Sequence, residues 1–99
     1  MPQPIVAYLD TDDAEQKIAD RHGVMIDDVY DMFERENWVV IRSKGKHPPE
    51  RKRFVGVTPG GHLLTVILAP MSEPDAWKVV SAWWSITEDI RLYDEGMRH

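Results

Sequence analysis

The sequence contains no cysteine, has no long hydrophobic run and carries more acidic than basic residues. Without Cys the chain can form neither disulfides nor thiolate metal sites, so any chemistry must use His, carboxylates, Lys, Arg, Tyr or Ser. No apolar run approaches the roughly 18 to 20 residues that a membrane-spanning helix needs, and residues 1–9 lack the pattern of a signal peptide. We therefore expect a cytoplasmic protein.

The length and composition are typical of one small domain. The chain has 99 residues, 42% of them apolar, with four Trp, three Tyr and two Phe. This is enough apolar material for one compact core. We expect a single domain over residues 1–99.

The charge is unevenly distributed along the chain. A net charge of -5 argues against nucleic-acid binding over the whole surface, because phosphate neutralisation needs clustered Lys and Arg. However, residues 1–36 contain ten acidic and three basic residues, whereas residues 37–78 contain seven basic and three acidic ones. Most of this positive charge lies between Arg42 and Arg53. One lobe should therefore be basic, and any RNA binding should be local and salt-sensitive.

Hydrophobic patterning predicts five short strands. They are expected at residues 5–9, 38–42, 52–58, 62–69 and 76–82. Thr58-Pro59-Gly60-Gly61 between the third and fourth suits a type II turn, because Pro fixes the first central residue and Gly60 accepts positive φ.

Three helices are predicted around these strands. The first covers residues 13–21, with Asp12 or Asp13 as its N-cap and His22-Gly23 closing it. The second covers residues 26–36, where Ile26, Val29, Met32 and Phe33 form an apolar stripe. The third covers residues 86–93, with Ser85 as N-cap, Glu88 in a capping box and Gly96 marking the end.

The predicted order of elements is β-α-α-β-β-β-β-α. Consecutive strands with short connections favour an antiparallel meander, and two adjacent amphipathic helices favour cover for one of its faces. The sequence therefore predicts an α+β fold.

Several short motifs then follow one another along most of the chain. They are His22-Gly23-Val24 before an acidic, apolar helix ending in Phe33, Glu50-Arg51 five residues before Gly56, Leu63-Leu64 before Val66, residues 78–82 (KVVSA), and Tyr93-Asp94-Glu95. In these motifs and their order the chain resembles the BrnT toxin family. The resemblance departs at Trp83-Trp84, because the family's Ser-Ala stretch runs into Arg and another basic residue.

The resemblance implies a fold, an activity and partners. The fold would be RelE-like, and the protein would be the toxin of a type II toxin-antitoxin system that cleaves RNA without a metal ion. A BrnA-like antitoxin with a ribbon-helix-helix part would neutralise it, in an assembly such as a homodimer or a toxin-antitoxin heterotetramer.

The residue types needed for such cleavage occur between Lys44 and Arg53. Metal-independent cleavage needs a base for the 2′-hydroxyl, an acid for the leaving oxygen and cations for the phosphate. We assign catalysis to His47, Glu50 and Arg51, and RNA binding to Lys44, Lys46, Arg53, Lys78 and Trp84. In strand geometry Arg51 and Arg53 share a face, so Lys52 should point away from them. The alternative for this charge run is a solvated loop and strand edge.

The remaining candidates have structural alternatives. Lys78 is a candidate RNA-binding cation by resemblance, although a single Lys on a strand is commonly an ordinary exposed residue. Trp83 and Trp84 should point to opposite sides of a strand, so one can be exposed for base stacking or for a protein partner. His22 is expected to interact with the carbonyls at its helix end. No motif for a metal or cofactor is present in the sequence.

Two functions therefore remain open. The first is a ribonuclease toxin, favoured by the Lys-His-Glu-Arg cluster. The second is a catalytically degenerate module on the same scaffold, which contacts a protein partner through its Trp pair and basic lobe and is favoured by Trp83 in place of a cation.

Overall fold

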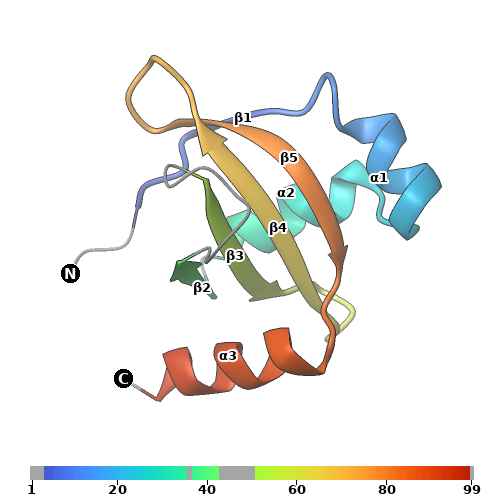
Figure 1. The fold of residues 1–99 in the computed structure, drawn as a ribbon, viewed down its shortest axis with the longest axis vertical. Coiled ribbons are helices and arrows are strands. Elements are labelled where there is room, and N and C mark those ends of the chain that lie inside the picture. Colours follow the sequence, from blue (N-terminus) through green and yellow to red (C-terminus); the bar gives the residue numbers. More distant parts are fainter. Residues whose placement is uncertain (1–3, 36, 43–50, 99) are drawn as a thin grey trace.

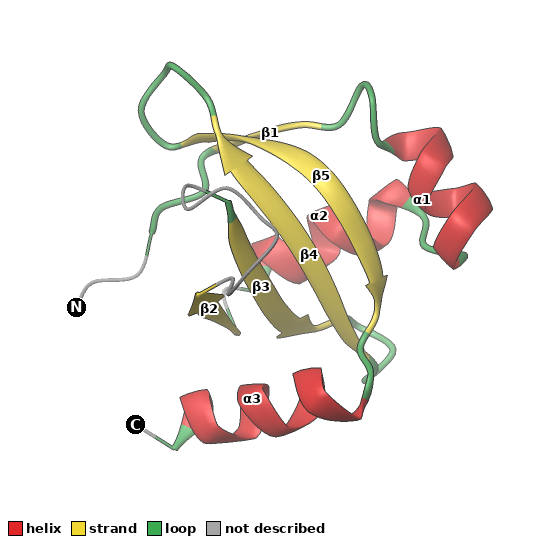
Figure 2. Ribbon diagram, in the orientation of Figure 1, coloured by secondary structure: helices red, strands yellow, loops and turns green. Residues whose placement is uncertain are grey.

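The computed structural model describes residues 4–35, 37–42 and 51–98 (Figure 1). Strands and helices follow one another in the order β1 (Tyr8–Asp10), α1 (Glu15–His22), α2 (Ile26–Glu34), β2 (Trp38–Arg42), β3 (Lys52–Val57), β4 (Leu63–Pro70), β5 (Ala76–Trp84) and α3 (Thr87–Met97). The predicted α+β class is confirmed (Figure 2). Within these ranges no helix is both long and apolar enough to cross a membrane.

The strands form one mixed sheet in the order β1-β5-β4-β3-β2. Neighbours from β2 to β5 are antiparallel, as a meander requires. β1 instead pairs with β5 in parallel, so the expectation of a purely antiparallel sheet is wrong at this edge. The chain reaches β5 from β1 only after two helices and three strands, and such a long connection allows a parallel pair.

Helices cover both faces of the sheet. α1 contacts β5, and α2 contacts β3 and β4, on the face where Phe54, Leu64 and Val66 form the main core. α3 packs on the opposite face, where Tyr93 joins Val39 and Val55 in a second cluster. This two-sided cover follows from strand alternation, which sends successive side chains to opposite faces.

The end of α1 matches the sequence prediction, but its start does not. Gly23 has φ 65°, and its N–H donates to the carbonyl of Ala19, which is the predicted left-handed cap. At the start, Ala14 occupies the N-cap position without a side-chain hydrogen bond, so capping by Asp12 or Asp13 is wrong. Ala14 is buried in the core, and Asp13 bonds elsewhere, to Lys78.

α3 begins one residue later than predicted and ends four residues later, at Met97. Ile86, rather than Ser85, is the N-cap residue, and Asp89 accepts its N–H in place of the predicted Glu88. Gly96 lies inside the helix. A Cβ at this position would come within 2.8 Å of Val39 Cγ1, so its lack of a side chain allows close packing of α3 on β2.

The turn between β3 and β4 is not type II. The positive φ, 84°, falls at Gly61 and not at Gly60. The Gly61 N–H donates to the Thr58 carbonyl over 2.9 Å, and Thr58 N–H donates to His62 O over 2.9 Å. A left-handed glycine at the end of such a hairpin loop suits the twist of the two strands.

Candidate functional site

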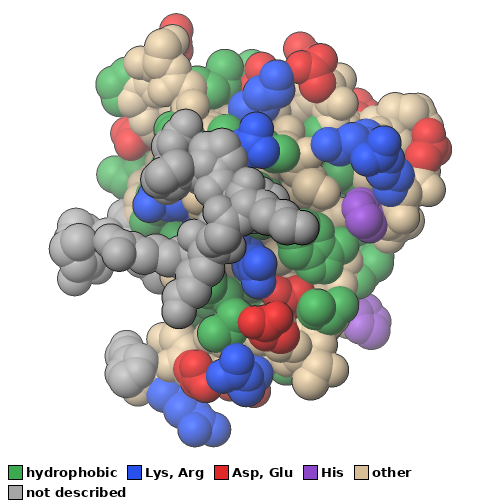
Figure 3. All heavy atoms as spheres, in the orientation of Figure 1, with side chains coloured by type: hydrophobic (Ala, Val, Ile, Leu, Met, Phe, Trp, Pro, Cys, Tyr) green, Lys and Arg blue, Asp and Glu red, His purple; other side chains and the backbone are tan. Residues whose placement is uncertain are grey.

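Arg53 and Lys78 lie on the same face of the sheet. Arg53 pairs in register with Ile67, and Lys78 pairs with Ala69, two residues further along β4. Register partners share a face, as do residues two apart, so both cations lie opposite the main core. Figure 3 shows Lys and Arg side chains spread over this side of the molecule, which is turned away from α2.

Asp89 holds Arg53 in a fixed position. Arg53 Nη1 donates to Asp89 Oδ1 over 3.1 Å, and the Asp89 side chain is fully buried. Asp89 Oδ2 accepts two further hydrogen bonds, from Trp83 Nε1 at 2.9 Å and from the Ile86 N–H at 3.2 Å. One carboxylate thus joins β3, β5 and the first turn of α3. Asp89 is the main feature of the site that the sequence prediction missed.

Arg53 keeps some contact with solvent. Its side chain is 22% exposed, and its buried Nε has no hydrogen-bond partner among the described residues. A guanidinium donates through several N–H groups in a planar fork, so bonding through Nη1 leaves others for an anion. Lys52 in the same strand pairs with Leu68 of the main core, and therefore faces away from Arg53, as predicted.

The Trp83 ring contacts the side chains of Arg53 and His22. The Arg53 guanidinium carbon is 6.0 Å from the centre of the Trp83 ring, a distance at which cation–π attraction is effective. The ring of His22, at the end of α1, is 6.3 Å from Trp83 and tilted by 55°. Because Trp83 Nε1 is bonded to Asp89, the indole is fixed in orientation. Neither the His22–Trp83 contact nor the Arg53–Trp83 contact could be predicted from sequence spacing.

Lys78 is paired with a carboxylate. Its Nζ lies 2.7 Å from Asp13 Oδ2, and both side chains are exposed. The hydrogen bond to Asp13, followed by the charge of that carboxylate, raises the pKa of Lys78, while the same contacts lower the pKa of Asp13. Nearby, Lys17 Nζ donates to the Val80 carbonyl over 2.6 Å, next to an irregularity in the β4–β5 pairing. β5 therefore carries one cation, Lys78, and its backbone binds a second, Lys17.

Trp84 is the more exposed member of the Trp pair. It is 37% exposed, its ring is 6.2 Å from that of His62, and its Nε1 is 3.4 Å from the Gly23 carbonyl oxygen. The ring lines a hollow of about 320 Å³ together with Leu63, Ser85 and Ile90, among others. The expectation that the two indoles point to opposite sides agrees with the register, in which Trp83 pairs with Thr65 and Trp84 with Leu64.

Half of the predicted site lies outside the described residues. These residues are Lys44, Lys46, His47 and Glu50. Arg51 directly precedes β3 and is half-buried, two residues from Arg53. The structure therefore places Arg53 and Lys78 on one face of the sheet, with Arg51 two residues before Arg53, while the catalytic assignment remains a prediction. In the described ranges no group of three or more His, Asp or Glu side chains could hold a metal ion.

The arrangement is that of a small α+β protein with a cationic, aromatic site on one face of its sheet. Among solved structures, the chain is similar to the ribonuclease toxin BrnT of Brucella abortus, with a TM-score of 0.57 and 18% sequence identity. The match covers 87% of this chain and 100% of that chain. The resemblance to BrnT is thereby confirmed for the fold. No protein-family model matches the chain, and the search of curated proteins found no match.

Proposed function

We propose that this chain is a ribonuclease toxin of the BrnT type, with a RelE-like fold, that cleaves RNA without a metal ion. The observation that carries this proposal is the fold shared with the BrnT ribonuclease toxin over that protein's whole length. A fold alone does not define a function, so the proposal also needs a site that suits RNA. Arg53 and Lys78 on one sheet face, with Trp83 beside Arg53, supply cations and a flat ring of the kind that RNA-binding surfaces use.

The proposed binding step relies on a preorganised cation. Asp89 orients Arg53 before RNA arrives, so less side-chain entropy is lost when the guanidinium meets a phosphate. Asp89 also offsets part of the Arg53 charge, and the remaining attraction comes from Arg51 and from Lys44 and Lys46 in the basic segment. Lys78 would have to exchange Asp13 for a phosphate, which is feasible at an exposed and salt-screened pair. The exposed ring of Trp84 points to the other side of β5 from Trp83, so it would stack on a base only where the RNA passes the end of that strand.

The proposed chemical step uses His47, Glu50 and Arg51. His47 and Glu50 move protons between the 2′-hydroxyl, which attacks the adjacent phosphorus, and the departing 5′-oxygen. Arg51 stabilises the negative charge that develops on the phosphoryl oxygens. These roles rest on residue type and on the position of Arg51 beside β3.

Expression of this chain alone in a bacterial host tests the proposal. We expect growth arrest with loss of intact RNA for the wild type, and relief by Arg51→Ala or His47→Ala. Arg98→Ala is the matched control, because it removes the same charge from an exposed residue beyond α3. Purified protein should cleave RNA in the presence of a chelator. Normal growth and intact RNA with folded wild-type protein would refute the proposal.

The same proposal specifies a partner and a place of action. A BrnA-like antitoxin with a ribbon-helix-helix part would hold the toxin inactive in the cytoplasm, as a heterotetramer or around a toxin homodimer. Co-expression of a BrnA-type antitoxin should restore growth, and size-exclusion chromatography with light scattering would give the stoichiometry.

A second candidate function is a binding module without catalysis. Exposed apolar side chains favour it: Trp84, Ile86 and Ile90 are 37%, 58% and 40% exposed around the end of β5 and the start of α3. Trp83 is half-buried and bonded to Asp89, so Trp84 is the more accessible member of the pair for a protein partner. This function predicts that Trp84→Ala weakens the complex with a co-expressed BrnA-type antitoxin, while RNA levels stay unchanged with either protein.

A further inference from the structure

The outer edge of β1 is open in the described sheet. β1 is at one end of the strand order, and its one described strand neighbour is β5. In a parallel pair, alternate residues direct their backbone N–H and C=O groups away from the partner strand. Such an edge is a template for another extended chain. Ala7 and Tyr8 are exposed at this position, and Tyr8 is 60% exposed.

A preformed hollow lies between this edge and α2. It measures about 280 Å³ and is lined by Tyr8 and Leu9 on one side and by Tyr30, Phe33 and Glu34 on the other. Val6 and Ala7 complete the lining, so the wall combines aliphatic and aromatic side chains with one carboxylate.

The hollow is held in place by a hydrogen bond and suits a particular kind of side chain. Tyr30 OH lies 3.4 Å from Thr11 Oγ1, which ties α2 to the end of β1 and keeps the hollow in place. A Lys or Arg side chain suits such a space, because its apolar stem packs against the rings while its charged end meets the carboxylate.

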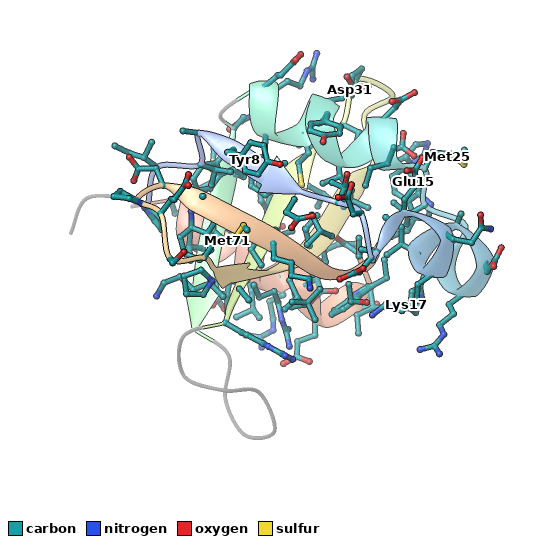
Figure 4. All side chains as sticks on the ribbon, turned by 90° about the horizontal axis from the view of Figure 1, so that it is seen from above. Tyr8, Glu15, Lys17, Met25, Asp31 and Met71 are labelled. Carbon is teal, nitrogen blue, oxygen red and sulfur yellow. The ribbon has the colours of Figure 1, made fainter. Side chains whose placement is uncertain are left out.

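Charge on the surrounding surface favours a basic occupant. Asp27, Asp31 and Glu34 recur at helical spacing on α2, with Tyr30 on the same face. Figure 4 shows Tyr8 of β1 and Asp31 of α2 on the same side of the molecule. A second copy of this chain would bring the same acidic edge against itself, and like charges placed opposite each other disfavour such pairing.

We propose that the outer edge of β1 and the adjoining hollow form a docking groove for a cationic, extended segment of a partner protein. The segment adds to the sheet as a strand, so backbone hydrogen bonds to β1 supply affinity. A Lys or Arg of the segment enters the hollow beside Glu34 and supplies specificity. This surface lies away from the basic face that carries Arg53, and the inference does not depend on ribonuclease activity.

An NMR titration of the full ¹⁵N-labelled chain tests the groove with a short peptide of alternating Lys and Val. We expect shift changes concentrated at residues 7–10 and along α2, and slower amide exchange at Leu9. The same peptide with Glu in place of Lys should not bind. An absence of binding at millimolar peptide, equal binding of the Glu peptide, or changes centred on the Arg53 face would overturn the proposal.

Charge reversal at the hollow gives a matched comparison. Glu34→Lys should weaken binding of the Lys peptide about tenfold, because an attractive contact becomes a repulsive one. Asp94→Lys makes the same change on an exposed residue of α3 and should leave the affinity unchanged. Equal affinity of the two variants would refute the assignment of Glu34. Light scattering of the free chain separates peptide docking from self-pairing, since a dimer formed through β1 would also overturn the proposal.

Discussion

Replacement of Asp89 by Ala tests how the candidate site is held together. The Asp89 carboxylate is fully buried and accepts hydrogen bonds from Arg53, Trp83 and the Ile86 N–H. The substitution removes all three acceptor contacts but leaves the three donors in place. It should therefore cost more than the loss of an ordinary surface carboxylate.

The structure gives a magnitude for this cost. Loss of the helix cap at Ile86 is worth about 1 kcal/mol, and an unsatisfied buried Trp83 N–H about 1–3 kcal/mol. Removing one partner of a fully buried ion pair costs about 3–5 kcal/mol, but Arg53 is 22% exposed, and water can partly solvate it after the change. These effects share one side chain and are not additive. We expect the free energy of unfolding to fall by about 3 kcal/mol, which is a large part of the total for a small domain.

Urea denaturation monitored by Trp fluorescence measures this loss. Asp94→Ala, at an exposed position of the same helix, should change the free energy of unfolding by less than about 0.5 kcal/mol. In a double-mutant cycle, Arg53→Met should reduce the cost of Asp89→Ala, because the donor that would lose its partner is gone. A cost for Asp89→Ala no greater than that of Asp94→Ala would refute the reasoning.

Two further predictions concern α3 and the Lys78 ion pair. Gly96→Ala should lower Tm, because a new Cβ would lie 2.8 Å from Val39 Cγ1. The cost of this overpacking, typically about 1–3 kcal/mol, exceeds the gain in helix propensity. The control Gly60→Ala should leave Tm nearly unchanged, since the atom nearest to its Cβ would be 3.7 Å away. The pKa of Asp13 should lie below its ordinary value of 3.8, and the pKa of Lys78 should lie above its ordinary value of 10.5. The ion pair therefore stabilises the folded state between these two pH values. Its contribution is lost as the pH falls through the folded-state pKa of Asp13 or rises through the folded-state pKa of Lys78. An NMR titration in which Lys78→Met leaves the pKa of Asp13 unchanged would contradict this pairing.

The fold could be predicted wherever local patterning determined it. β2 begins at Trp38 and ends at Arg42, as predicted, because a run of β-prone residues lies between polar segments. In α2 the predicted stripe is buried at Val29 and Met32. The parallel pairing of β1 could not be predicted, since a three-residue strand has no periodicity that selects a partner more than sixty residues away.

The candidate site was harder to predict than the fold. Strand alternation correctly predicted that Arg53 and Lys52 lie on opposite faces of the sheet, because successive side chains of a strand point to opposite sides. Asp89 was missed because a carboxylate in the first turn of a helix is usually exposed. Its burial depends on Arg53, which lies 36 residues earlier in another element. A one-residue error at the start of α3 made Glu88 the predicted capping residue, although it is exposed.

Trp83 illustrates why one missing cation does not by itself decide the function. The sequence suggests that Trp83 removes a positive charge from the site, but the indole bonds to Asp89 and lies against Arg53. Replacing Trp83 would therefore disturb the cation that remains, through the same carboxylate that caps α3. Stability and site geometry are coupled through Asp89. A Trp83 or Asp89 variant that loses activity therefore identifies a role in RNA binding only when the folded fraction is measured in the same sample. Arg51 has no such link to the Asp89 network among the described contacts, so Arg51→Ala is the cleaner test of the proposed cleavage.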